Sequence, residues 1–204
     1  MTYAWDESVS AYAAAAAAFV RLTGAVGDRW DDPALGEWDV RALVGHTTRA
    51  FLTVEAYLQK PAARVEIGSA ADYYRATRSI AAGPDVAERG RDAGRALGHH
   101  PVSAVGEIGT RVLALVGTKD GTELLTTIAG GMRLSDYLPT RTFELAVHGA
   151  DLASALDVPF DLPAPAAAQA LHLVEELAVA DDRAAPLLLA ATGRRALPPG
   201  FSLL

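Results

Sequence analysis

Residues 141–152, which read RTFELAVHGADL, place ionisable side chains inside an otherwise apolar helical pattern. In a helix each residue turns about 100° from the last, so five polar residues fall within roughly 80° of one another. These residues, called the ionisable stripe below, are Tyr137, Arg141, Glu144, His148 and Asp151. Apolar residues border the stripe on both sides, whereas a solvent-facing charged stripe lies opposite the apolar arc. We therefore expect the stripe to face the interior, where each charge must be paired, hydrogen-bonded or bound to a metal.

A histidine in a second predicted helix faces inward in the same way. This helix begins after the N-cap residue Asp39, and His46 lies at the edge of its apolar face. Two histidines and a glutamate from facing helices are what an open mononuclear divalent-metal site requires. Glu144 and His148 are one helical turn apart, so both can reach one ion. Asp151 can accept the second ring N–H of His148 and fix its tautomer.

The same residues also fit a protein without a metal. A glutamate and a histidine four residues apart on a helix commonly form an ion pair, and an inward histidine is commonly hydrogen-bonded in a core. Arg141 has two interpretations as well: it binds a substrate carboxylate, or it forms a salt bridge with Glu144 or Asp151. The residues alone leave a metal centre and a buried ionic network both open.

Composition narrows the classes of function. The chain has no cysteine, so any thiol chemistry must use an external thiol. The net charge of −7, without clustered lysine and arginine, argues against a nucleic-acid partner. The alanine-rich residues 11–20 have no basic lead-in and stop at Arg21, so they resemble neither a signal peptide nor a membrane span. We expect a cytoplasmic protein with no membrane partner.

Hydrophobic periodicity and turn residues predict a mainly α protein. We expect helices over residues 6–28, 40–58, 69–97 with a break at AAGP (81–84), 101–117, 134–156 and 163–180, and one strand over 122–128. Residues 1–160 are predicted to form a helical bundle. Residues 161–204 are predicted to form a small α/β-type appendage, with a short C-terminal helix and an extended tail packed on the bundle.

Two motifs resemble those of a known family. EWDVRALVGHTTRAF, residues 37–51, is similar to the W-x-V-R-D-L-V-x-H-L motif of the mycothiol-dependent maleylpyruvate isomerase N-terminal family, a branch of the DinB-like metalloenzyme superfamily. MRLSDYLPTRTFELAVHGADLASAL, residues 132–156, is similar to the family's second motif, in which an arginine precedes E-x-x-x-H-x-x-D-L. The two motifs occur in the family's order and at about its separation.

The resemblance implies a DinB-like four-helix bundle in which His46, Glu144 and His148 hold a divalent metal, zinc first and nickel second. Our leading hypothesis adds, from the spacing argument above, that Asp151 orients His148 and that Arg141 contacts the substrate. The implied activity is isomerisation or S-transfer on a small molecule, with mycothiol or another low-molecular-weight thiol as cosubstrate. Alanine, glycine and arginine usage hints at an actinobacterial source, which favours mycothiol.

A second hypothesis comes from a different class of protein. The chain is then a non-catalytic bundle that binds a small molecule or forms a homodimer, with the His46, Glu144 and His148 triad structural or metal-free.

Overall fold

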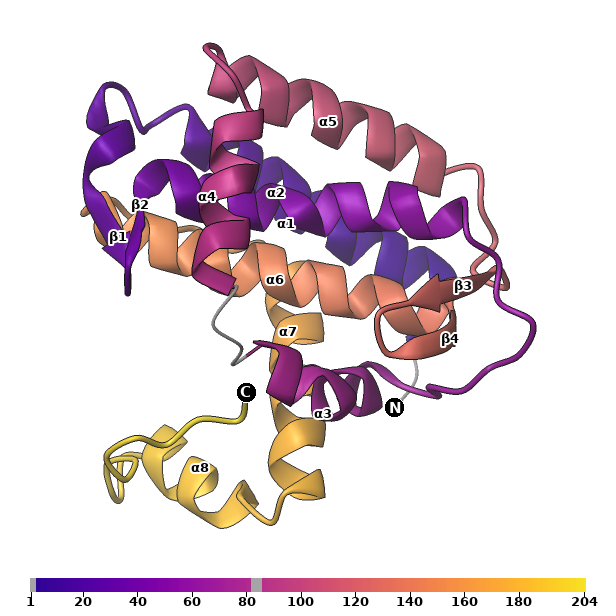
Figure 1. The fold of residues 1–204 in the computed structure, drawn as a ribbon. Helices are drawn as coiled ribbons and strands as arrows, with labels where there is room; N and C mark the ends of the chain where they lie inside the picture. Colours follow the sequence, from indigo (N-terminus) through magenta and orange to yellow (C-terminus); the bar gives the residue numbers. More distant parts are fainter. Residues whose placement is uncertain (1–2, 82–85) are drawn as a thin grey trace.

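The fold of this computed structural model is mainly helical, as the sequence predicts, and the structure describes residues 3–81 and 86–204 (Figure 1). The helices are α1 (Trp5–Thr23), α2 (Val40–Leu58), α3 (Ala70–Ala81), α4 (Val86–Ala96), α5 (Pro101–Val116), α6 (Leu134–Ala155), α7 (Ala164–Ala180) and α8 (Ala184–Ala191), with a 3-10 turn at Arg29–Asp31. The strands are β1 (Pro33–Leu35), β2 (Trp38–Asp39), β3 (Leu124–Thr127) and β4 (Gly130–Arg133).

Helices α1, α2, α5 and α6 form a four-helix bundle. Helix α6 packs against α1 and α2 on one side, and α5 packs against the same two helices on the other (Figure 1). Large apolar side chains of all four helices fill the space between them, and the hydroxyl of the buried Tyr12 donates to the carbonyl of Ala50 at 3.1 Å. The bundle therefore buries one continuous core along the two helices that carry the predicted site.

The start of α2 is fixed by the cap that the sequence predicts. The side chain of Asp39 accepts a hydrogen bond from the backbone N–H of Ala42 at 2.7 Å. This bond satisfies one of the donors that a helix leaves free at its first turn. Helix α4 then crosses α2 at close range, because a Cβ at Gly45 would lie only 2.1 Å from the backbone nitrogen of Gly94.

A short antiparallel hairpin precedes each of the two site helices. Strands β1 and β2 lead into α2, and strands β3 and β4 lead into α6, where the N–H of Leu134 donates to the carbonyl of Glu123 at 2.8 Å. The strand predicted over residues 122–128 is observed as β3, in register with β4 from Leu124 opposite Arg133 to Thr127 opposite Gly130. Both hairpins set where their helix begins.

The structure differs from the predicted elements at several points. The first helix ends at Thr23 rather than at residue 28, since Gly24 closes it and Gly27 takes a positive φ of 63°. The break predicted at AAGP (81–84) coincides at its first residue with the end of α3, and its other three residues lie outside the described residues. The described residues 161–204 contain α7, α8 and an irregular tail but no strand, so the α/β character expected there is wrong.

The physical reason lies in the composition of that segment. Prolines 163 and 165 suit the start of a helix, and the alanine and leucine run that follows favours α7. Two prolines and a glycine at residues 198–200 disfavour strand pairing in the tail. Helix α7 packs on α1, α3 and α6, and α8 packs on α7.

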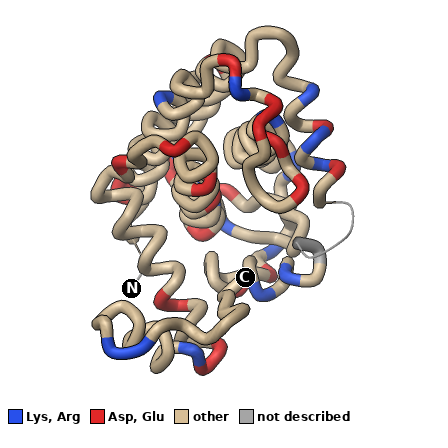
Figure 2. Tube along the Cα trace, turned by 90° about the vertical axis from the view of Figure 1, so that its left-hand side faces the viewer, with Lys and Arg blue, Asp and Glu red and all other residues tan. Residues whose placement is uncertain are grey.

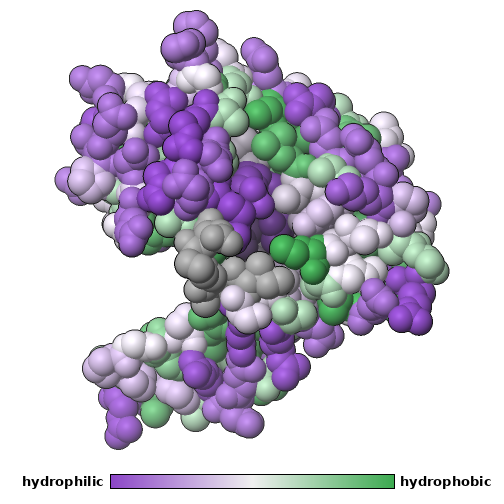
Figure 3. All heavy atoms as spheres, in the orientation of Figure 1, coloured by the Kyte–Doolittle hydropathy of each residue, from purple (hydrophilic) through white to green (hydrophobic). Residues whose placement is uncertain are grey.

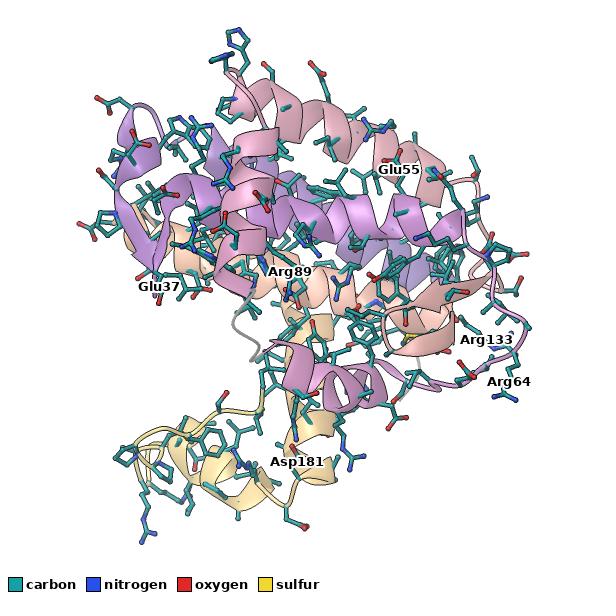
Figure 4. All side chains as sticks on the ribbon, in the orientation of Figure 1. Glu37, Glu55, Arg64, Arg89, Arg133 and Asp181 are labelled. Carbon is teal, nitrogen blue, oxygen red and sulfur yellow. The ribbon has the colours of Figure 1, made fainter. Side chains whose placement is uncertain are left out.

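Helix α8 and the tail 192–204, called the C-terminal lobe below, lie beyond one side of the bundle (Figure 1). The space-filling view shows a notch between this lobe and the bundle (Figure 3). Arg78 of α3 ties the two together, because it forms an ion pair with Asp181 and donates to the carbonyl of Leu203 at 2.9 Å. Asp181 lies at the end of α7, where the chain leaves the bundle (Figure 4).

Charged residues of both signs are interspersed along the chain (Figure 2). Over the part of the chain that the structure describes, no helix combines the length and the apolar character that crossing a membrane requires.

Candidate metal centre

The three predicted ligands come together from two neighbouring helices. His46 lies on α2, and Glu144 and His148 lie one turn apart on α6. A ligand atom of each lies within 4.8 Å of the other two, and the Nε2 atom of His148 is 3.2 Å from the Oε2 atom of Glu144. Within residues 3–81 and 86–204 this is the single cluster of three such groups with metal-binding geometry.

His46 is held by aromatic neighbours rather than by hydrogen bonds. Its ring lies 4.5 Å from that of Trp38, centroid to centroid, and meets the His148 ring edge-on at 5.0 Å. Its Nδ1 atom is buried and has no hydrogen-bond partner among the described residues. Burial, followed by the nearby His148, lowers the pKa of His46 to about 4. The ring is therefore neutral near pH 7, which is the form that ligates a metal.

Asp151 lies beside the Nδ1 atom of the His148 ring, as the sequence predicts. Its Oδ2 atom lies 3.0 Å from the Nδ1 atom of His148, which leaves Nε2 directed at Glu144. Burial alone would lower the pKa of His148, but the hydrogen bonds to Asp151 and Glu144 outweigh it and raise the pKa to about 9. A carboxylate behind a histidine is the arrangement that orients metal-bound imidazoles.

Glu144 is half-buried, and its neighbours favour its charged form. Tyr74 of α3 places its hydroxyl oxygen 2.7 Å from Oε1, and the Nη2 atom of Arg141 lies 3.8 Å from the same oxygen. Burial alone would raise the pKa of Glu144, but the hydrogen bond to His148 and the charge of Arg141 outweigh it and hold the pKa well below its usual range. Glu144 is thus a carboxylate across the physiological pH range.

Arg141 belongs to the same cluster and is only 7% exposed. Its Nε atom donates to the hydroxyl of Thr140 at 2.8 Å, and its guanidinium lies over the rings of Tyr137 at 4.9 Å and Tyr73 at 5.6 Å. Of the two salt-bridge partners that the sequence suggests, the structure places Glu144 beside it. Tyr137 is fully buried, and its hydroxyl donates to that of Thr53 at 2.9 Å.

A cavity of about 380 Å³ opens directly onto this cluster. Aromatic and apolar side chains form much of its wall, and Arg49, Arg89 and Arg141 add positive charge. Arg49 and Arg89 form no ion pair with any residue that the structure describes, and Arg89 lies on α4 (Figure 4). The cavity is large enough for a small organic molecule, and its polar groups favour an anionic one.

The model of one protein family matches the chain over residues 12–153, and that family is described as the mycothiol maleylpyruvate isomerase N-terminal domain. The chain belongs to this family. The match begins within α1 and ends within α6, so it includes the bundle and all three clustered residues. Comparisons with curated proteins and with solved structures find no significant match.

The remaining histidines of the chain lie away from this cluster. His99 and His100 are exposed at the start of α5, and His172 lies on α7 near Glu175 and Glu176. None of them joins the cluster on α2 and α6.

Several residues of the site could not be predicted from the sequence. Tyr74, Arg49 and Arg89 face the cavity from three helices, and the sequence gives no signal for them beyond ordinary amphipathic patterning. Trp38 lines the cavity beside His46, with which its ring is in contact.

Proposed function

We propose that this protein binds a divalent cation, zinc first and nickel second, through His46, Glu144 and His148. We further propose that it uses this cation with a low-molecular-weight thiol to isomerise or S-conjugate a small electrophile. The convergence of the three donor groups at the floor of a ligand-sized cavity carries the proposal. The family supports mycothiol as the thiol.

The residues present fit such a cation. Two imidazole nitrogens and one carboxylate oxygen are the donor set of open zinc sites, in which a further position remains for an exogenous ligand. His46 is neutral, Glu144 is ionised, and a buried ring nitrogen of His46 lacks a partner among the described residues. His148 must lose a proton to bind, so binding is expected to strengthen as the pH rises toward 9.

When bound, the cation supplies Lewis-acid chemistry that lowers the pKa of a thiol, so that thiolate is available near neutral pH. The chain's own residues orient the ligands and bind the electrophile. Asp151 orients His148, the aromatic walls limit the access of water, and Arg49 and Arg89 attract an anionic electrophile into the cavity. Arg141 is proposed to contact that electrophile at the cavity wall.

Neither the isomerisation nor the transfer reaction requires an oxidant. In an isomerisation the thiolate sulfur adds to one carbon of a cis double bond, the remaining single bond rotates, and loss of the same thiolate returns the trans isomer. In a conjugate addition the new carbon–sulfur bond stays, and the carbanion left on the neighbouring carbon takes a proton from water. Because the chain has no cysteine, the sulfur nucleophile has to come from the cosubstrate.

A non-catalytic binding protein is the second candidate. His148 already lies within ion-pair distance of both Glu144 and Asp151, and such contacts build a metal-free ionic network. In that case the cavity binds an anionic ligand without turnover.

Metal content separates the two candidates. The protein is purified without an affinity tag or chelator and analysed by elemental mass spectrometry beside His46→Ala, His148→Ala and the control His99→Ala. We expect about one equivalent of zinc or nickel in the wild type and the control, and little in the two site variants. Thiol consumption with a panel of unsaturated acids and other electrophiles then tests turnover. A wild-type protein without metal, even after reconstitution, would leave the binding protein as the better explanation.

A further inference from the structure

Tyr74 reaches the candidate metal centre from α3, a helix that carries none of the three proposed ligands. Its hydroxyl oxygen lies 2.7 Å from the Oε1 atom of Glu144 and 3.1 Å from the carbonyl oxygen of Thr140. The contact with the carboxylate is the shorter of the two and is charge-assisted, so the hydroxyl proton is directed mainly at Glu144.

The two carboxylate oxygens of Glu144 have different surroundings. Oε2 faces the Nε2 atom of His148 at 3.2 Å, on the side of the histidine pair. Oε1 faces Tyr74, and the Nη2 atom of Arg141 at 3.8 Å is too distant for a hydrogen bond. Among the residues that the structure describes, Tyr74 is therefore the sole hydrogen-bond donor to Oε1.

Tyr74 is also fixed in place. Its side chain belongs to the core, with 8% of the residue exposed. Its ring packs edge-on against Phe143 at 5.4 Å and against Tyr73 at 5.7 Å. The hydroxyl cannot turn away from Glu144 without disturbing these contacts, so the donor is in position before any ligand arrives.

A carboxylate can bind a cation through one oxygen or through both. We infer that Tyr74 is a positioning residue that confines Glu144 to one-oxygen binding through Oε2. By occupying Oε1, Tyr74 keeps one more coordination position open for an exogenous ligand. This inference rests on the proposed metal centre and adds a residue that holds a ligand in its productive orientation.

Cobalt(II) is the probe, because the intensity of its visible absorption per bound ion falls as its coordination number rises. The full chain is loaded with Co2+ as wild type, Tyr74→Phe and Tyr57→Phe. Tyr57→Phe is the matched control, since Tyr57 lines the same cavity from α2 and forms no hydrogen bond with the cluster among the described residues. Tyr74→Phe keeps the packed ring, and circular dichroism checks its fold.

We expect weaker visible bands for Tyr74→Phe and unchanged bands for Tyr57→Phe. A competition titration should show Co2+ affinity lowered by roughly 10-fold or more in Tyr74→Phe, as for other residues that support a metal ligand. Bands of unchanged intensity in Tyr74→Phe, with or without a loss of affinity, would overturn the inference and leave the metal centre standing. Equal changes in both variants would overturn it too. A wild-type protein that binds no Co2+ would instead overturn the proposed metal centre.

Discussion

His46 and His148 carry opposite pKa shifts, which gives the metal-free protein a defined pH dependence. The pKa of His46 is lowered from 6.5 to about 4. Protonation of this histidine in the unfolded chain therefore lowers the stability of the fold as the pH falls below 6.5. The pKa of His148 is raised from 6.5 to about 9, so its contribution is complete below 6.5 and is lost as the pH rises through 9. We predict that the unfolding free energy of the chelated protein is greatest near pH 6.5, as measured by urea denaturation across this range.

The variant Asp151→Asn is the control for the loss of stability above pH 6.5. The substitution removes a charge that raises the pKa of His148, so the loss of stability above pH 6.5 should be smaller and should end at a lower pH, while the dependence below pH 6.5 stays unchanged. Stability that keeps rising from pH 6.5 to 9 in the chelated wild type would contradict the raised pKa.

At the residue scale, spacing within one helix was enough to predict part of the site. Glu144, His148 and Asp151 lie on one stripe because the helical repeat fixes their directions, and the apolar residues around His46 predicted that it faces inward. Tyr74 and Arg89 could not be found in this way. They lie on α3 and α4, and no local pattern states where those helices cross α2 and α6.

At the element scale, the crossing of α2 and α4 depends on two glycines. A Cβ on Gly45 would lie 2.1 Å from the backbone nitrogen of Gly94, and backbone cannot move aside as a flexible side chain can. We predict that Gly45→Ala lowers the unfolding free energy by about 1–3 kcal/mol or more, because it forces the helices apart. Chemical denaturation measures the change.

Gly106→Ala on α5 is the matched control for that substitution. Its added Cβ would meet only a methyl group of Val20 at 4.0 Å, so the usual helix preference for alanine should stabilise the protein by about 0.5–1 kcal/mol. The prediction for Gly45 is wrong if the two variants unfold alike. Since α4 carries Arg89 and Val86 into the cavity wall, Gly45→Ala should also weaken ligand binding.

Long elements were predicted more reliably than short ones. The helices of the bundle follow from several turns of consistent apolar spacing, and β3 follows from its threonines and branched residues. Strands β1 and β2 span Pro33–Leu35 and Trp38–Asp39, which is too short for an alternating pattern to be recognised. The end of α1 was misplaced because the apolar spacing was followed past Gly24 and Gly27, which are helix stop signals in the sequence.

At the scale of the whole molecule, a division at residue 160 does not separate two independent units. Helix α7 buries Leu173 and Leu177 against the bundle, and the amide of Gln169 donates to the hydroxyl of Ser8 on α1 at 3.1 Å. A chain ending at residue 160 would expose the surfaces of α1 and α6 that α7 covers. Helix α8, by contrast, has no buried residue.

Two truncated chains test this division. Burial of two leucines contributes about 3–6 kcal/mol, and each kcal/mol shifts the melting temperature of a chain of this size by about 2–4 °C. We therefore predict that a chain ending after residue 160 melts roughly 10 °C or more below the full chain, or aggregates. A chain ending after Asp182 retains α7 and the ion pair between Arg78 and Asp181, so it should melt close to the full chain and keep any bound metal. Equal melting of the full chain and the chain ending after residue 160 would show that the bundle is complete without α7.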